Sequence, residues 1–221
     1  SVWLTLTLGL ARVDYPSITS RFADESGLLG NVMAIKRYNG VLYAGTMRGL
    51  FKLQFNQFGS PEFIQVSQVM GQVNTLIVAK EKGRDVLLVG SNQDIYRISG
   101  SSINRFGSED ALTYRFLKPR TGNNVIYVVS ERSLKRLVND KGVWRLDNAW
   151  KSINEYCTEL IDLKGGNLLG RTKNGLFLIE PSGNTKKLVE RIGVQGRIFE
   201  IEGNVYVVSD SHAFRLGAVD Q

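Results

Sequence analysis

Cysteine, histidine and proline are scarce in this sequence, which has one, one and four of them among 221 residues. The single cysteine, Cys157, excludes a disulfide within the chain and a cysteine-based zinc cluster. One cysteine and one histidine, His212, are too few for a transition-metal site. No stretch approaches the roughly 20 apolar residues of a membrane-spanning helix. We therefore expect no metal and no other cofactor, and membrane attachment only through segments outside this chain.

Glycine and hydrophobic residues, by contrast, are abundant. The 23 glycines and the 43% of hydrophobic residues, arranged in short Val, Ile, Leu and Tyr runs, predict an all-β fold with frequent tight turns. The net charge is +7, and the basic residues are spread along the whole sequence. Nucleic-acid binding calls for a concentrated basic stripe, so no nucleic-acid partner is predicted. The charge indicates either a solvated surface or attraction for an anionic ligand.

The strongest pattern is an internal repeat of roughly 40 residues. In five segments an apolar run ends in Thr, Ser or Asp, and an apolar residue follows four positions later. The polar anchors are Thr46, Ser91, Ser130, Thr172 and Asp210. Their spacings are 45, 39, 42 and 38 residues. The following apolar anchors are Leu50, Ile95, Leu134, Leu176 and Phe214.

Each repeat reads as a β-hairpin preceded by two further strands. The apolar run is expected to be a strand buried on both faces, and the short gap a tight turn. Before the apolar anchor, Gly49 and Gly175 suit a positive φ and Asp94 tolerates it, whereas Ser133 and Ala213 predict another turn geometry. Four strands at this period predict the blade of a β-propeller. The blades are expected at about 15–54, 55–99, 100–140, 141–180 and 181–217.

In this arrangement the farther of the two strands that precede the hairpin opens each blade, as SITSRFA, residues 17–23, does in the first. Residues 1–14 match only the hairpin half of a sixth blade, with Leu10 aligned to Leu50. An unclosed propeller exposes sheet edges and apolar faces. We therefore expect five complete blades and a half blade that form part of a propeller of about seven. A homodimer that closes the ring and a compact irregular ring are alternatives.

One stretch resembles a known repeat. Gly27–Leu53, GLLGNVMAIKRYNGVLYAGTMRGLFKL, is similar to the two-component regulator propeller repeat, with Leu29 at the usual proline and Tyr43 at the usual tryptophan. Residues 142–179 resemble a second copy, with Arg171 at a glycine position. The resemblance implies a sensor domain outside the cytoplasmic membrane. In such proteins a small β-sandwich, a transmembrane helix and a histidine kinase or diguanylate cyclase follow the propeller.

Candidate catalytic residues are few. His212 falls in a predicted hairpin turn, where a solvated side chain is expected. Cys157 opens an apolar strand and is expected to be a buried structural thiol. The carboxylate pairs Asp24–Glu25 and Glu109–Asp110 are neighbours in loops, which is typical of solvated pairs. The chain itself is therefore predicted not to be an enzyme, although its parent protein would carry a kinase or cyclase domain.

Propellers bind ligands at the mouth of the central channel, with the loops that enter and leave the inner strands. In this chain such loops carry basic residues in three successive predicted blades, and one tyrosine offers a flat aromatic surface. The candidate ligand-binding residues are Arg37, Tyr38, Lys82, Arg84 and Arg120. An anionic small molecule or saccharide is the expected ligand. The alternative is that these basic loops only keep the rim soluble.

The sequence thus predicts a non-catalytic, periplasmic or otherwise extracytoplasmic sensor propeller of a bacterial membrane signalling protein. A soluble scaffold that binds another protein through a propeller face is the second interpretation. A propeller hydrolase or lyase is the third, and it would need a deep pocket that gathers acidic residues.

Overall fold

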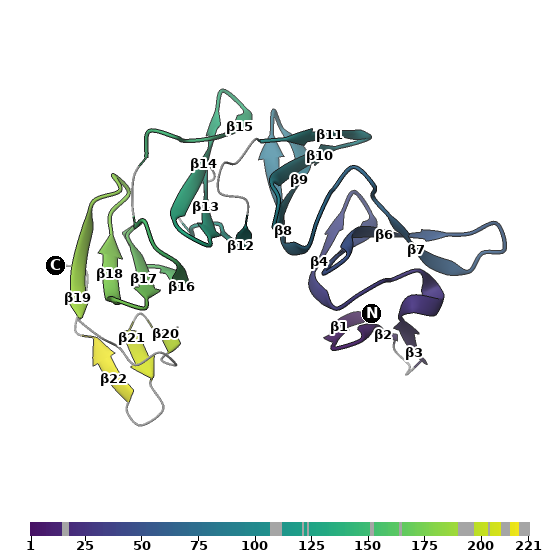
Figure 1. Ribbon diagram of the computed structural model, residues 1–221, viewed down its shortest axis with the longest axis horizontal. Helices are drawn as coiled ribbons and strands as arrows, with labels where there is room; N and C mark the ends of the chain where they lie inside the picture. Colours follow the sequence, from purple (N-terminus) through teal and green to yellow (C-terminus); the bar gives the residue numbers. More distant parts are fainter. Residues whose placement is uncertain are drawn as a thin grey trace. The chain divides into compact units, whose positions relative to one another are not determined.

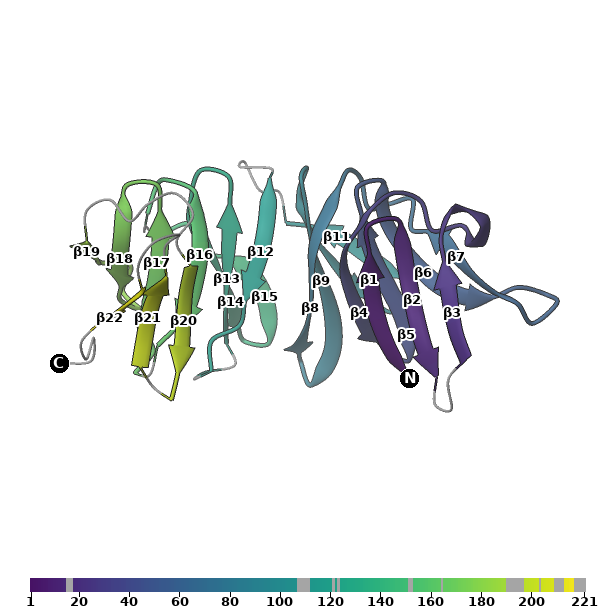
Figure 2. The same cartoon turned by 90° about the horizontal axis from the view of Figure 1, so that it is seen from below.

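The computed structural model describes residues 1–14, 18–106, 112–120, 122, 124–150, 153–163, 165–189, 197–202, 204–208 and 213–216. Within these ranges the strands form six antiparallel sheets, each a meander in chain order (Figures 1 and 2). The chain divides into two compact units, Ser1–Phe116 with Lys141–Val143 and Leu117–Asp140 with Trp144–Gln221. The strands β12 (Thr113–Leu117) and β15 (Val143–Leu146) contain residues of both units.

The first unit contains the first three sheets. The sheet β1-β2-β3 consists of Val2–Leu6, Gly9–Asp14 and Ile18–Phe22. A 3-10 helix η1, Asp24–Ser26, leads to the sheet of β4 (Val32–Tyr38), β5 (Val41–Thr46), β6 (Gly49–Phe55) and β7 (Pro61–Gln65). The third sheet consists of β8 (Val73–Glu81), β9 (Arg84–Ser91), β10 (Ile95–Ser99) and β11 (Ser102–Arg105).

Three sheets follow in the remainder of the chain. The fourth consists of β12 (Thr113–Leu117), β13 (Val125–Ser130), β14 (Leu134–Asp140) and β15 (Val143–Leu146). The fifth consists of β16 (Cys157–Asp162), β17 (Leu168–Thr172), β18 (Gly175–Ile179) and β19 (Thr185–Val189). The last consists of β20 (Arg197–Ile201), β21 (Asn204–Val208) and β22 (Ala213–Leu216).

Within each unit, neighbouring sheets pack face to face through their apolar runs. In the first unit one buried cluster joins the first and second sheets, for example Leu10 and Phe22 with Leu42. A second cluster joins the second and third sheets, and the first strands of these sheets, β4 and β8, lie side by side. In the second unit a cluster that includes Leu176 and Val207 joins the last two sheets. This packing of four-stranded meanders is that of propeller blades, and the predicted all-β propeller fold is confirmed.

The phase of the sheets differs from that of the predicted blades. Residues 17–23 were expected to open the blade 15–54, but β3 pairs with the hairpin that precedes it, with Leu10 opposite Phe22. Likewise β7 pairs with β6, and β19 with β18. The described residues thus form four sheets of four strands and two of three. The repeat in the sequence shows the length of the repeating unit. It does not show whether the strand between two hairpins pairs with the preceding or the following hairpin, because that depends on hydrogen bonds between strands. The larger ring of about seven blades stays a prediction.

The polar anchors of the repeat hold the hairpin turns. The hydroxyl oxygens of Thr46, Ser91 and Thr172 each accept the backbone N–H two residues later, at 3.0 Å. All three hydroxyl side chains are buried, and removing one would take away the side-chain acceptor that holds the N–H of its turn. Asp210 lies outside the described residues.

Among the described residues that precede an apolar anchor, only the glycines have a positive φ. The serine turn therefore differs from the glycine turns, as predicted, and the alanine turn lies outside the described residues. Gly49 and Gly175 have φ of +134° and +136°, conformations that L side chains rarely adopt. Asp94 is not among the residues with positive φ. Its buried carboxylate instead accepts the backbone N–H of Ile95 at 2.7 Å and pairs with Arg105 Nε at 2.9 Å. The turn with Asp94 is therefore held by side-chain hydrogen bonds and needs no left-handed residue.

In the second unit a cluster around Asp147 fixes the loop after β15. Arg136 Nε and Nη2 donate to Asp147 Oδ2 at 2.9 and 2.7 Å, and the guanidinium lies 5.1 Å from the ring centre of Trp150. Asp147 Oδ1 accepts the backbone N–H groups of Ala149 and Trp150. Burial disfavours the charged carboxylate, but the hydrogen bonds and charge of Arg136, together with these N–H groups, outweigh it and lower the pKa of Asp147.

The substitution Asp147→Asn is expected to lower the free energy of unfolding by about 1–2 kcal/mol at pH 7. Because the folded-state pKa is lowered, this stabilisation is present above the unfolded-state pKa of Asp and is lost as the pH falls through the folded-state value. Urea unfolding at pH 7 and at about pH 3 should therefore show the difference from wild type shrinking at the lower pH. The control is Asp140→Asn, which breaks the exposed pair with Arg145 and should cost less than about 0.5 kcal/mol. A loss at Asp147 that is equal at both pH values would contradict this account.

Candidate functional site

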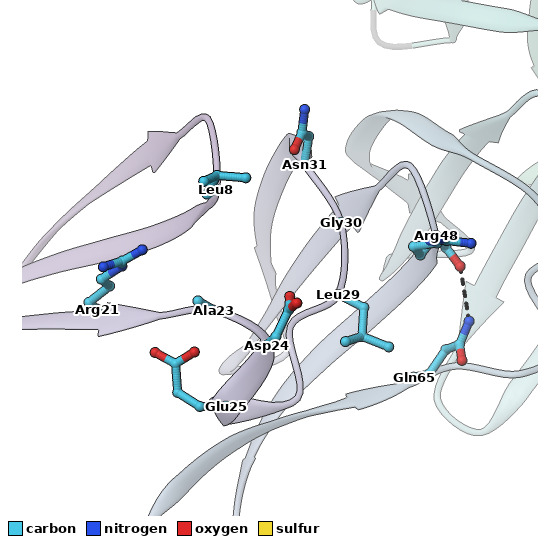
Figure 3. A pocket seen from close by; sticks show the side chains of 10 residues that line it. All are labelled: Leu8, Arg21, Ala23, Asp24, Glu25, Leu29, Gly30, Asn31, Arg48 and Gln65. Carbon is cyan, nitrogen blue, oxygen red and sulfur yellow. Dashed lines mark hydrogen bonds between the residues drawn. The ribbon is translucent and has the colours of Figure 1, made fainter.

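A pocket of about 770 Å³ lies in the first unit, where β4 begins and the β1–β2 and β5–β6 turns approach it (Figure 3). Its volume falls within the roughly 300–1,000 Å³ typical of small-molecule sites. It is lined by Leu8, Arg21, Ala23, Asp24, Glu25, Leu29, Gly30, Asn31, Arg48 and Gln65. These residues come from the first and second sheets and from the segment that joins them, so the pocket lies over the junction of two neighbouring blades.

The wall of the pocket is the loop that carries the repeat motif, residues 27–31. Leu28 is fully buried in the core between the two sheets, while Leu29 beside it is 43% exposed toward the pocket. Gly27 and Gly30 have φ of +79° and +78°, which fits the preference for glycine at left-handed positions. Asn31 accepts the N–H of Met47 through its backbone oxygen at 3.1 Å. The motif therefore anchors one leucine in the core and presents the next to the pocket.

The opposite side of the pocket is formed by the β5–β6 turn and the end of β7. Gln65 Nε2 donates to the backbone oxygen of Arg48 at 3.0 Å (Figure 3). A Cβ atom at Gly30 would lie 2.9 Å from Arg48 Cγ, so the absence of a side chain at Gly30 allows the aliphatic part of Arg48 to lie against the loop. This close contact places Arg48 at the edge of the pocket.

Four charged side chains surround the pocket without internal partners. Arg21, Asp24, Glu25 and Arg48 are exposed, and their side chains make no hydrogen bond or ion pair with other residues of the described ranges. Figure 3 shows the Asp24 carboxylate between Arg21 on one side and Arg48 on the other. Two positive and two negative groups are thus available to a bound molecule.

Four of the five ligand-binding residues predicted from the sequence lie in the first unit, at the ends of the strands opposite to the pocket. Arg37 and Tyr38 end β4, a strand of seven residues that begins at the pocket, and Lys82 and Arg84 lie at the β8–β9 turn. Arg37 is exposed, and its guanidinium donates to the backbone oxygen of Gly40 at 2.8 Å. Their role in ligand binding stays a prediction.

The expected aromatic surface of Tyr38 is not present. Only 3% of Tyr38 is exposed, because its ring packs in the core between the second and third sheets. Its hydroxyl donates to the backbone oxygen of Asp85 and accepts the N–H of Gly100, both at 3.2 Å. Tyr38 therefore ties the end of β4 to the neighbouring blade. Successive side chains of a strand point to opposite faces of the sheet. At the end of a strand, next to a turn, the sequence alone does not show on which face a side chain such as that of Tyr38 lies.

Arg120 lies in the second unit and is held by acidic residues of that unit. Its guanidinium binds the Glu200 carboxylate through two contacts of 2.8 and 2.7 Å, and its backbone N–H donates to the buried Asp162. The hydrogen bond and charge of Glu200 raise the pKa of Arg120. An anion that bound to this guanidinium would have to compete with Glu200.

Of the residues that the sequence offers for catalysis, Cys157 is placed in the structure, whereas His212 is not among the described residues. Cys157 is 1% exposed and its thiol contacts the backbone oxygen of Glu159 at 2.9 Å, which confirms the buried structural thiol. His212 and the pair Glu109–Asp110 lie outside the described residues. In the part of the chain that is described, no group of three or more His, Cys, Asp or Glu side chains could hold a metal ion. Across the same ranges, no helix has the length and apolar character to cross a membrane.

Sequence reasoning missed the pocket itself. The sequence indicates only a solvated pair at Asp24–Glu25, and no motif points to Arg21 or Arg48. The available signal was the motif of residues 27–31, whose two glycines predict a loop with left-handed residues. The side chains that face this loop could not be predicted, because Arg21 reaches the pocket from β3 and Arg48 from the β5–β6 turn.

The fold is similar to that of solved extracellular domains of one-component and hybrid two-component systems. The extracellular domain of a one-component system from B. thetaiotaomicron has a TM-score of 0.63 at 16% identity, over 97% of this chain and 31% of that one. That of a hybrid two-component system from the same organism has a TM-score of 0.64 at 18% identity, over 93% and 30%. The chain thus spans about a third of the length of these domains.

Lyases are also similar in fold. The virginiamycin B lyase from Staphylococcus aureus has a TM-score of 0.58 at 12% identity, over 95% of this chain and 73% of that one. No protein-family model matches the sequence, and the search of curated proteins gives no match. At identities this low the similarities establish the propeller fold alone.

Proposed function

We propose that this chain is a ligand-sensing, non-catalytic propeller segment of a bacterial membrane signalling protein, located outside the cytoplasm. The observation that carries the proposal is the pocket over the junction of the first two blades, whose charged side chains have no partners among the described residues. The similarity to extracellular domains of one-component and hybrid two-component systems supports the same class of function. The repeat motif supports it as well, because its loop forms the wall of the pocket.

The position of the pocket suggests how binding would become a signal. A ligand there contacts η1 and β3 from one side, and the β5–β6 turn from the other. Because these elements belong to adjacent blades, a bound molecule would favour one spacing of the two sheets over another. A ligand shifts such an equilibrium only as far as its affinities for the two states differ.

The test is a thermal-shift screen of the purified chain against amino acids, short peptides, sugars, sugar acids and phosphorylated metabolites. Hits are then titrated against two matched double variants, Arg21→Gln with Arg48→Gln at the pocket, and Arg37→Gln with Arg84→Gln at the opposite strand ends. We expect the pocket variant to weaken binding at least tenfold, and the other to leave it unchanged. The reverse result would move the site to the residues predicted from sequence.

The soluble scaffold remains the second candidate, because exposed apolar side chains such as Leu8 and Met70 could also contact a protein. A screen in which no small molecule binds, together with a full-length gene that encodes no membrane segment, would favour the scaffold. A membrane segment followed by a kinase or cyclase domain in that gene would favour the sensor.

A further inference from the structure

The charges around the pocket restrict the kind of molecule that fits it. Arg21 and Arg48 contribute two positive charges, and Asp24 and Glu25 two negative charges. Since none of them is paired with another described residue, each can interact with a ligand. A ligand of one sign only would be attracted by two of these groups and repelled by the other two. A ligand with one positive and one negative group can use both kinds.

The uncharged lining indicates the body of such a ligand. Leu8 and Leu29 are 69% and 43% exposed at the pocket, and they offer aliphatic surface that an apolar group would cover. The ten lining residues include no aromatic side chain, so this pocket has no flat ring on which a sugar or a nucleobase could stack. Asn31 and Gln65 lie at the border of the pocket, and side-chain amides can bond both peptide N–H and peptide C=O groups.

We propose that the pocket binds a short zwitterionic peptide with aliphatic side chains, an inference that rests on the proposed sensor function. Arg48 binds the terminal carboxylate, because its aliphatic part already lies against Gly30 and its guanidinium can form two parallel hydrogen bonds. Asp24 binds the terminal ammonium group, because its carboxylate points into the space between the two arginines (Figure 3). The volume of about 770 Å³ leaves room for more than a single amino acid.

The experiment uses leucyl-leucine and two analogues that each lack one charge, N-acetyl-leucyl-leucine and leucyl-leucinamide. Isothermal titration of the 221-residue chain is expected to show binding of leucyl-leucine, and binding at least tenfold weaker for each analogue. In Asp24→Asn, the free and the N-acetylated peptide should bind equally. In Arg48→Gln, the free peptide and the amide should bind equally, and Arg48→Lys should restore part of the difference.

Each variant has a control for folding and for charge. Circular dichroism shows whether Asp24→Asn and Arg48→Gln keep the wild-type structure. Arg132→Gln removes one exposed positive charge in the β13–β14 turn, which is not among the elements that line the pocket. If glucuronate or inorganic phosphate binds at the pocket and leucyl-leucine does not, the peptide inference is wrong while the sensor proposal stands. If no probe and no member of the wider screen binds, both are wrong.

Discussion

The substitution Gly90→Ala is expected to lower the free energy of unfolding of the first unit by about 2 kcal/mol, through overpacking between two blades. Gly90 lies in β9, and an added Cβ would come within 2.6 Å of Cγ2 of both Thr75 and Thr113, and within 3.2 Å of Phe116 Cζ. The φ of Gly90 is not positive, so the effect is steric and not one of backbone strain. Urea unfolding followed by circular dichroism measures it.

Removing the two methyl groups should relieve the clash. The double change Thr75→Ser and Thr113→Ser takes away both Cγ2 atoms and keeps both hydroxyls, including the Thr75 oxygen that accepts the N–H of Phe116 at 3.3 Å. On this background Gly90→Ala should cost clearly less than on wild type. Gly45→Ala, the same position in the second sheet, should resemble Gly90→Ala because Val73 Cγ1 lies at 2.5 Å. A full-sized loss on the serine background would contradict the steric explanation.

The substitution Glu159→Ala is expected to cost about 3 kcal/mol, because it removes the carboxylate that faces a buried guanidinium. Arg171 directly precedes the polar anchor of its repeat, a position that is glycine in two other repeats, Gly45 and Gly90. The Arg171 side chain is only 8% exposed. Its Nε lies 3.7 Å from Glu159 Oε2, and the same oxygen accepts the N–H of Ile198 in β20 at 2.6 Å. The carboxylate thus compensates a buried charge and joins two sheets of the second unit.

Two variants separate these roles. Glu159→Gln keeps an oxygen for the Ile198 N–H but removes the negative charge, so its loss should be smaller than that of Glu159→Ala. Combining Glu159→Gln with Arg171→Met removes both charges, and stability should then return toward that of wild type. If the combined variant is as unstable as the sum of the two single variants, charge compensation is not the cause.

Local patterns in the sequence identify most of the strands. The buried hydroxyls of Thr46 and Ser91 hold their turns through contacts within three residues, so a repeated local spacing was enough to predict the hairpins. Gly49 adopts the positive φ that its place before the apolar anchor predicts. Such features depend on residues close together in the chain, and for that reason one sequence suffices to read them.

Contacts between distant segments could not be predicted in the same way. The sequence does not show that β7 joins β6 and not the following hairpin, because an outer strand matches either neighbour in hydrophobic pattern. It does not show that the ring of Tyr38 is buried, since its partners Asp85 and Gly100 lie 47 and 62 residues away. The hydrogen bond from the Ile198 N–H to Glu159, 39 residues away, is a further contact of this kind.

The repeat of apolar runs and polar anchors was by itself sufficient to determine the all-β blade and its hairpins, and the apolar strand that Cys157 opens was sufficient to predict its burial. Only the tertiary structure decided which strands share a sheet, and which charged side chains meet at the pocket. Arg21 and Asp24 are close in the chain, at β3 and η1, but Arg48 in the β5–β6 turn joins them only when the first two sheets pack. A hairpin is specified by neighbours in the chain, whereas a pocket between blades depends on how separate elements pack against each other.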